Sequence, residues 1–257
     1  MILSHRAALN GVELDSLDNR ILIQGIEEAA GKEQISAVSL FGGAGQRITN
    51  QRRDTLDVTV RFSIRIKKND MEAREEVFEK VSAWAAGGGW LTINYKPDRR
   101  LKVVCAQFAP AGDMWNWANS YSIVFRAYSI PYWQQATPNK LMASGSTFNR
   151  QFGVAGSAQT VLDIEYKCNG GTCTTFKVVA GRSTIELTGL ALTSGQTLAI
   201  KHTEDGLLQI TAGGRSVLDK RTAASSDDLY VSPGAVTVYI YAQQAGTVTI
   251  SCAGRYA

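Results

Sequence analysis

Few side chains in this sequence are of a type that does acid–base or nucleophilic chemistry. The two histidines, His5 and His202, lie in no recognisable nucleophile motif, and no G-x-S-x-G occurs. A glycosidase needs two carboxyl groups that face each other across a cleft. Asp163 and Glu165 instead alternate with apolar residues, which places both on the solvated face of a strand. We therefore predict no catalytic residues and no enzyme activity.

The cysteines do not form a metal-ligand pattern. Cys168 and Cys173 have a C-x4-C spacing, whereas a structural zinc site needs four nitrogen or sulfur ligands, usually as two close pairs. The other two cysteines, Cys105 and Cys252, are isolated in the sequence. We predict no metal site. Two interpretations of the spaced pair stay open, namely free thiols in a glycine-rich hairpin turn or a disulfide that forms in an oxidising medium.

The glycine runs do not match a cofactor loop. Neither Gly42–Gly45 nor Gly87–Gly89 completes a P-loop or a dinucleotide-binding motif. The second run also follows an expected helix, and anions bind at the other end of a helix. We predict turns at both places and no cofactor.

Composition divides the chain into two parts. The 257 residues carry a formal charge of +4, and all five tryptophans precede residue 134. Residues 1–135 are charged at 32 positions and residues 136–257 at 18, and the second part is rich in Thr, Ser, Gly and Val. Such a shift predicts two domains, which we place at 1–133 and 140–257 with a linker at 134–139.

The first part is typical of an α+β domain with antiparallel sheets and one main helix. Residues 56–67 alternate between apolar and charged or polar side chains, which predicts a half-solvated strand. A helix is expected to begin at the N-cap Asn69 or Asp70 and to end at Gly87–Gly89. A turn is expected at Pro97-Asp98.

The second part is predicted to be all-β. Seven or more short runs of alternating residues are separated by Gly, Asn, Ser or Asp turns, which favours a sandwich. Such sandwiches often bind glycans, and an aromatic ring usually stacks on the sugar. The second part has no Trp, but it contains Tyr166, Tyr230, Tyr239, Tyr241 and Tyr256. A carbohydrate-binding or adhesin module is therefore the alternative function.

Five stretches, taken in order, resemble the distal tail protein of long-tailed siphophages and related prophages. They are ALNGVELDSLDNRILIQGIEE (8–28), GQRITNQRRDTLDVTVRFSIR (45–65), EAREEVFEKVSAWAAGGGWLTINYKPDRRLKVV (72–104), SYSIVFRAYSIPYWQ (120–134) and LYVSPGAVTVYIYAQQAGTVTISCAGRYA (229–257). The resemblance spans nearly the whole chain. It implies a ring-forming first domain and a galectin-like second domain, so that the expected fold is β-rich throughout.

The resemblance also implies partners and a location. The ring, commonly a hexamer, would join the tail tube protein to tail-tip and receptor-binding proteins, and DNA would pass through its channel. The protein would be made in the bacterial cytoplasm and located at the distal end of the virion tail. The sequence shows no secretory signal, and no apolar run reaches the ~18 residues of a membrane span, so no membrane association is expected.

Candidate contact residues follow from this expectation. Aromatic side chains are favoured in contacts between subunits, which suggests Trp115 and Trp117 as contact residues. The alternative is that one of them packs in the core and the other lies on the surface. The charged face of the 56–67 strand, with Arg61, Arg65 and Lys67, is a second candidate that would line the channel or contact the tube. The interdomain seam is expected at Pro131, Tyr132, Trp133 and Pro138, with Pro131 ending the last strand of the first domain.

Overall fold

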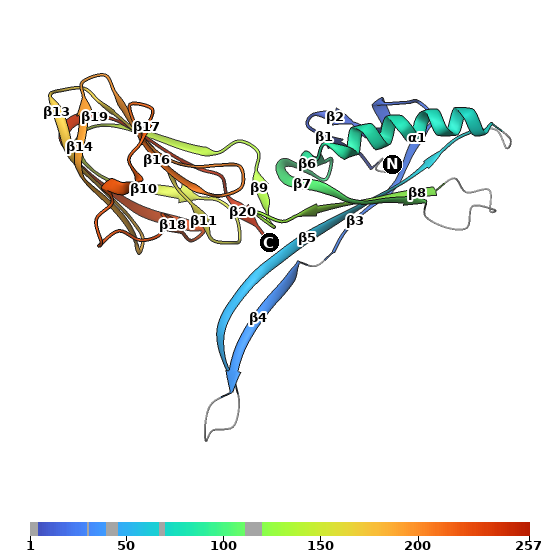
Figure 1. Cartoon of the computed structure of the whole chain (residues 1–257), viewed down its shortest axis with the longest axis horizontal. Coiled ribbons are helices and arrows are strands. Elements are labelled where there is room, and N and C mark those ends of the chain that lie inside the picture. Colours follow the sequence, from blue (N-terminus) through green and yellow to red (C-terminus); the bar gives the residue numbers. More distant parts are fainter. Residues whose placement is uncertain (1–4, 30, 40–45, 67–69, 111–119) are drawn as a thin grey trace. The chain divides into compact units, whose positions relative to one another are not determined.

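A computed structural model describes residues 5–29, 31–39, 46–66, 70–110 and 120–257. The chain divides into two compact units, Met1–Trp133 and Gln134–Ala257. Both are built mainly from antiparallel strands, and the one α-helix of the described residues lies in the first unit (Figure 1). This confirms the predicted β-rich fold class.

The first unit is a twisted sheet with a helix across one face. The strands pair in the order β2-β1-β6-β7-β8-β5-β3, and β4 pairs with β5. The elements are β1 (Ala7–Leu9), β2 (Val12–Glu13), η1 (Leu14–Ser16), β3 (Ile21–Glu28), β4 (Lys32–Ser39), β5 (Gln46–Ile64), α1 (Met71–Ala86), β6 (Gly89–Ile93), β7 (Lys96–Pro110) and β8 (Ser120–Ala127), and β9 (Trp133–Gln135) spans the division between the units.

Helix α1 begins and ends as its sequence predicts. The Asp70 side chain accepts a hydrogen bond from the Ala73 N–H at 3.1 Å, which satisfies one of the free donors of the first turn. Gly87 is the C-cap. Val77, Val81 and Ala85 are the buried residues of the helix. Figure 1 shows α1 lying along one face of the sheet, and the other face is open.

Strand β5 is the central and longest strand of this unit. Along it Val58, Val60 and Phe62 are fully buried, whereas Thr59 and Arg61 point to the opposite face. The alternation predicted for residues 56–67 is thus confirmed as far as Ile64, where the strand ends. The strand begins earlier than expected, at Gln46, because its first part pairs with β4.

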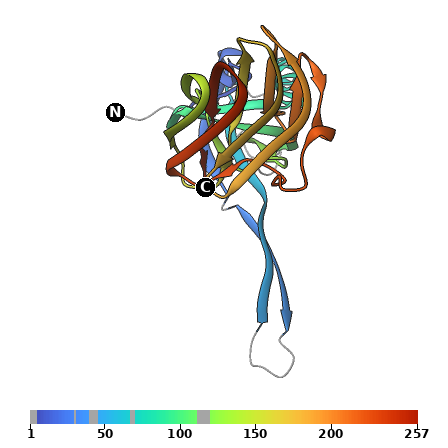
Figure 2. The ribbon, with the colours of Figure 1, turned by 90° about the vertical axis from the view of Figure 1, so that its left-hand side faces the viewer.

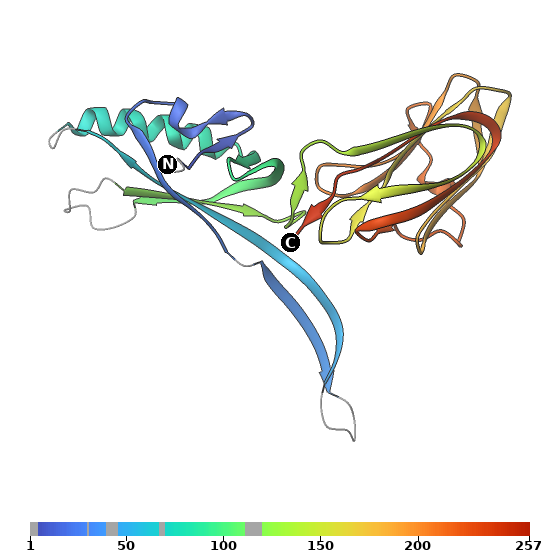
Figure 3. The same cartoon turned by 180° about the vertical axis from the view of Figure 1, so that it is seen from behind.

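The hairpin of β4 and the first part of β5 projects from the sheet as an arm. Figures 1, 2 and 3 show two strands there with no third strand beside them. Ile35, Val38 and Ile48 on this arm are 54 %, 57 % and 56 % exposed. The first unit therefore leaves apolar surface of the arm uncovered. A two-stranded hairpin without further packing is only marginally stable in water.

Two local predictions are wrong. The turn between β6 and β7 is formed by Asn94 and Tyr95, and Pro97-Asp98 belongs to β7. Pro97 is tolerated there because the β6–β7 register is irregular at that point, and a strand can hold proline where a ladder bond is absent. Strand β8 ends at Ala127, which pairs with Leu56 at the end of the β5–β8 ladder. The strand therefore stops before Pro131, and the proline does not end it.

The second unit is an all-β sandwich. Its elements are β10 (Asn139–Val154), β11 (Thr160–Val161), β12 (Asp163–Cys168), β13 (Thr172–Ala180), β14 (Ser183–Thr193), β15 (Thr197–His202), β16 (Leu208–Ala212), β17 (Arg215–Ser216), η2 (Leu218–Lys220), β18 (Tyr230–Val231), β19 (Gly234–Cys252) and β20 (Arg255–Tyr256). Strand β10 pairs with β19 along most of its length. The first part of β19 pairs with β13 and the last part with β12, and the strands on both sides enclose one apolar core.

Gly246 lies where β19 passes from one of these partners to the other. A Cβ there would come within 2.2 Å of Tyr166 Cε2 and 2.4 Å of the Lys167 carbonyl oxygen. Tyr166 is fully buried, and its hydroxyl donates to the Gln244 carbonyl at 2.7 Å. The ring therefore has little room to move away, and only glycine fits this position.

We predict that Gly246→Ala destabilises the second unit by about 1–3 kcal/mol or more, because overpacking displaces the ring or the backbone. Chemical denaturation checks this value. Gly153→Ala on β10 is the matched control, since a Cβ there meets nothing within 4 Å. Equal stability of the two variants would contradict the role given to Gly246.

Candidate functional site

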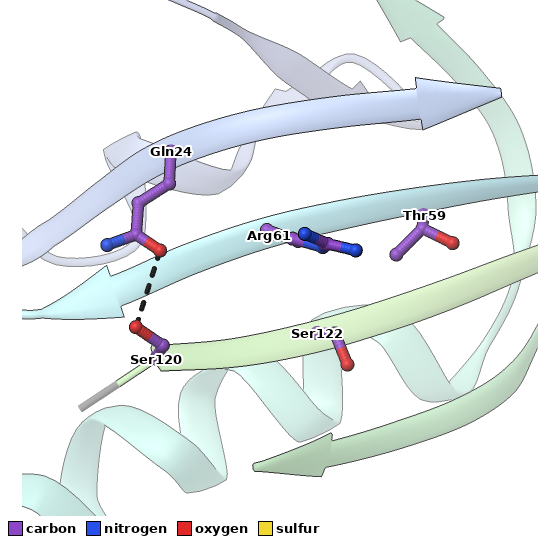
Figure 4. A pocket seen from close by; sticks show the side chains of 5 residues that line it. All are labelled: Gln24, Thr59, Arg61, Ser120 and Ser122. Atoms are coloured by element: carbon purple, nitrogen blue, oxygen red, sulfur yellow. Dashed lines mark hydrogen bonds between the residues drawn. The ribbon is translucent and has the colours of Figure 1, made fainter. Parts of the chain in front are cut away.

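The face of the sheet that α1 leaves open holds a shallow polar pocket. It has a volume of about 350 Å³ and is lined by Gln24, Thr59, Arg61, Ser120 and Ser122 from β3, β5 and β8 (Figure 4). The Ser120 hydroxyl donates to Gln24 Oε1 at 3.4 Å. The lining offers hydroxyl, amide and guanidinium groups but no His, Cys or carboxylate. It is therefore suited to binding a polar surface, and its serine and threonine hydroxyls have no base among the lining residues that would activate them as nucleophiles.

Arg61 is the sequence-predicted site residue that this pocket contains. Its guanidinium forms an ion pair with Glu27 Oε2 at 3.0 Å, with both side chains more than half exposed. Arg65 follows the end of β5 and is exposed, and its backbone N–H donates to the Arg20 carbonyl at 2.8 Å. The remaining three candidates, Lys67, Trp115 and Trp117, lie outside the described residues.

The predicted seam residue Trp133 is anchored on the first unit. Its side chain is 1 % exposed, and the indole Nε1–H donates to Glu28 Oε2 at 2.7 Å. Lys96 Nζ lies 2.5 Å from the same oxygen and 4.8 Å from the centre of the indole ring. Tyr132 lies under the Arg53 guanidinium, 4.9 Å from its ring centre. Glu28 ends β3 directly before the arm and Arg53 lies on β5, so both aromatic residues contact the base of the arm.

On the other side of the division, the expected linker is partly regular structure. Gln135 belongs to β9, which pairs with β20, and its N–H donates to the Gly254 carbonyl at 2.8 Å. Pro138 is half-buried and directly precedes β10. Regular structure thus extends from both sides into residues 134–139.

His202 is buried between two carboxylates. Its Nδ1 lies 2.7 Å from Asp163 Oδ1 and its Nε2 lies 2.7 Å from Asp228 Oδ1, and the imidazole is 6 % exposed. Burial by itself lowers the pKa of His202, but the hydrogen bonds to Asp163 and Asp228 outweigh burial and raise that pKa to about 9. At neutral pH the ring is an imidazolium that donates to both carboxylates.

This cluster is a structural tie. It joins the end of β15 to the start of β12 and to the segment before β18, and no Ser, Thr or Cys side chain of the described residues hydrogen-bonds to the His202 ring as a triad would require. Sequence reasoning placed Asp163 on a solvated strand face and did not find its partners. His202 is 39 positions from Asp163 and 26 positions from Asp228. No sequence motif links residues at these separations.

The remaining sequence candidates give no reactive site in the described residues. Cys168 and Cys173 are buried and free, and their thiols donate to the backbone carbonyls of Gly170 and Thr175. No group of three or more His, Cys, Asp or Glu residues that could hold a metal occurs in the described ranges. No helix described in the structure is long and apolar enough to cross a membrane.

The tyrosines named for sugar binding have different environments. Tyr166 is fully buried in the core of the second unit, which excludes it from any surface site. Tyr230, Tyr239 and Tyr241 are exposed. The last two lie two residues apart on β19 and therefore on one face of the sheet. Carbohydrate binding stays a prediction.

The described residues thus form two β-rich units, and the first unit carries a long arm and an open polar pocket. The structure is similar to the crystal structure of the SPP1 Dit (gp 19.1) protein, which is described as a paradigm of the hub adsorption apparatus in phages that infect Gram-positive bacteria. The TM-score is 0.71, the identity is 12 %, and the match covers 96 % of this chain and 98 % of that one. At this identity the likeness shows the fold.

Two further structures, of the phage P2 baseplate in its activated conformation with Ca and with Sr, match at TM-scores of 0.43 and 0.40 and identities of 6 % and 7 %. They cover 97 % and 96 % of this chain and 98 % and 97 % of the matched chains. These scores are too low to support a conclusion. No protein-family model and no curated protein sequence matches the chain.

Replacing Trp133 by Phe removes the indole N–H that donates to the Glu28 carboxylate. We predict a loss of about 1.5–3 kcal/mol in the stability of the first unit, because hydrogen bonds to charged groups contribute that much. Trp84→Phe is the control, since Trp84 Nε1 donates to the neutral Val12 carbonyl at 3.1 Å, and a smaller loss of about 0.5–1.5 kcal/mol is expected. Urea denaturation followed by near-UV circular dichroism measures both, and a Trp133→Phe loss no greater than that of the control would argue against the anchor.

The His202 cluster makes the stability of the second unit pH-dependent. Because the folded pKa of His202, about 9, exceeds its ordinary value of 6.5, its contribution is fully present below pH 6.5 and is lost as the pH rises through 9. The contribution is on the order of 3 kcal/mol. Denaturation midpoints at pH 6, 8 and 10 should converge for the wild type and His202→Gln as the pH rises. A constant gap between the two proteins across this range would contradict the assignment.

Proposed function

We propose that this chain is the structural hub of the tail tip of a long-tailed phage or prophage. Copies of the chain form a ring, a hexamer, that joins the tail tube protein to tail-tip and receptor-binding proteins, and DNA passes through its channel. The protein is made in the host cytoplasm and functions, without catalysis, at the distal end of the virion tail. The likeness to the SPP1 Dit fold supports this proposal, and the arm of the first unit carries it.

The arm has the properties of a contact element between copies. Ala37 and Ile48 are paired across the hairpin, so they lie on the same face, and Ile35 lies on that face two residues before Ala37. These apolar residues are exposed in the part of the hairpin where, among the described residues, β4 and β5 pair only with each other. A neighbouring subunit that covers them would stabilise both the hairpin and the assembly.

The edges of the sheet also favour repeated pairing. Strand β3 ends the strand order and pairs on one side, with β5. At the other end of the strand order, β2 pairs with β1 alone among the described residues. Unpaired strand edges bind further strands. Two different edges on one subunit suit head-to-tail association, which closes into a ring when the rotation between subunits allows it.

In such a ring, we assign the open face of the sheet to the channel. This is the face that carries the pocket around Arg61, with its hydroxyl and amide side chains (Figure 4). Helix α1 then covers the opposite face, away from the channel. A lining of mixed polar groups, with Arg61 neutralised by Glu27, holds no continuous basic track that would retain passing DNA.

The test is the mass of the purified chain in solution over a wide concentration range. The proposal predicts a discrete species of six times 27.8 kDa. Ile35→Asp combined with Ile48→Asp should raise the concentration needed for assembly at least tenfold and leave circular dichroism unchanged. Met142→Asp, at a 69 % exposed position of the second unit, is the control and should assemble as the wild type does. A strict monomer at every concentration would contradict the ring.

A further inference from the structure

Three side chains form a cationic surface around an indole ring on the first unit. Trp90 on β6 is paired with Lys102 on β7, and both alternate with the fully buried Leu91 and Leu101, so they face away from the core. The Arg100 guanidinium carbon lies 3.9 Å from the centre of the Trp90 ring, and Lys102 Nζ lies 5.5 Å from it. Trp90, Arg100 and Lys102 are called the cationic indole surface below.

Arg100 differs from other arginines of the same sheet in having no carboxylate partner. Arg126 is paired with Asp57 at 2.6 Å and Arg61 with Glu27 at 3.0 Å. In the described ranges no carboxylate lies within ion-pair distance of Arg100, whose Nε is shielded from solvent and has no hydrogen-bond partner. Arg100 as a whole is half-buried, so an incoming carboxylate could reach the part of its guanidinium that is exposed and form a charge-assisted hydrogen bond there.

The chemistry of this surface fits an acidic protein segment. Tryptophan and arginine are the residues most enriched where contacts between proteins contribute most to binding. A nucleic acid would require a longer basic track than two cations on one ring, and the chain's formal charge is only +4. The occupant expected from charge is therefore a run of carboxylates on a protein surface.

The chain itself carries such a run. Glu72, Glu75 and Glu79 are exposed on α1 at spacings of three and four residues, which places them along one side of the helix. None of the three forms an ion pair with a described residue, whereas their neighbour Glu76 is paired with Lys80 at 2.7 Å and with Arg20 at 3.2 Å. Like charges at this spacing destabilise a helix, so cations from outside the subunit would stabilise this acidic stripe.

We propose that the cationic indole surface of one copy of this chain binds the acidic stripe, Glu72, Glu75 and Glu79, of the next copy. The inference rests on the proposed ring and names one of its contacts. The two surfaces are different parts of the subunit, one on the outer side of α1 and one on the side of the sheet that α1 does not cover. The contact is therefore heterologous, the type that builds rings.

The twist of the sheet makes this contact compatible with a channel-facing pocket. In the strand order β6 lies three steps from β5. Each step rotates a strand by roughly 20–25°, so three steps turn the surface by about 60–75°. The cationic indole surface is thus turned by roughly this angle from the face that carries the Arg61 pocket, so the two surfaces need not point in the same direction.

Charge reversal on each surface tests the pairing. Arg100→Glu alone, and Glu75→Lys with Glu79→Lys alone, should each raise the dissociation constant of assembly at least tenfold, measured by analytical ultracentrifugation of the full chain. A 1:1 mixture of the two variants should assemble again, because every contact then joins opposite charges. Combining all three substitutions in one chain should also restore assembly. Lys220→Glu, an exposed site on the second unit, is the control and should have no effect.

The outcomes separate this contact from the ring itself. If the wild type assembles and Arg100→Glu assembles equally well, the contact is wrong and the ring proposal stands. If both single-surface variants fail but neither the mixture nor the combined variant recovers, the two surfaces do not meet each other. If the wild type is monomeric throughout, the ring fails and this contact fails with it. Circular dichroism and thermal unfolding of each variant verify that it is folded before assembly is compared.

Discussion

The first unit depends on the alternation of side chains along β5. One face of this strand is buried, with Val58, Val60 and Phe62 fully covered, and the other face carries Thr59 and Arg61. A shift of one residue in register would exchange the two faces, so the strand can pair with β3 and β8 in only one way. The same strand continues into the arm. The core, the polar pocket and the contact element are thereby fixed by one continuous segment.

The last residue of the first unit, Trp133, is bound at the base of the arm. Glu28 accepts hydrogen bonds from Trp133 and Lys96, and Tyr95 Oη lies 3.2 Å from its other carboxylate oxygen. A half-buried carboxylate with this many donors is fully compensated. Because Glu28 directly precedes the arm, the position of the arm and the anchoring of residue 133 depend on the same group.

Local signals in the sequence identified the elements that depend on near neighbours. Asp70 predicted the start of α1, and the alternation of residues 56–64 predicted the buried and open faces of β5. The arm was missed because polar and charged residues between Gln46 and Thr55 mask a strand that is stabilised by pairing with β4. The turn predicted at Pro97 is absent because the irregular register between β6 and β7 lets the strand include a proline. The carboxylate partners of His202 and the stacking of Arg100 on Trp90 depend on tertiary contacts, which spacing in one sequence does not encode.

The central claim is that this chain closes into a ring by head-to-tail contacts. Electron micrographs of the purified full chain, prepared above the concentration at which the mass in solution stops increasing, test it most directly. The account predicts closed rings with a central channel and a constant number of subunits, six. Isolated particles of the size of one chain, or open filaments without closure, would contradict it.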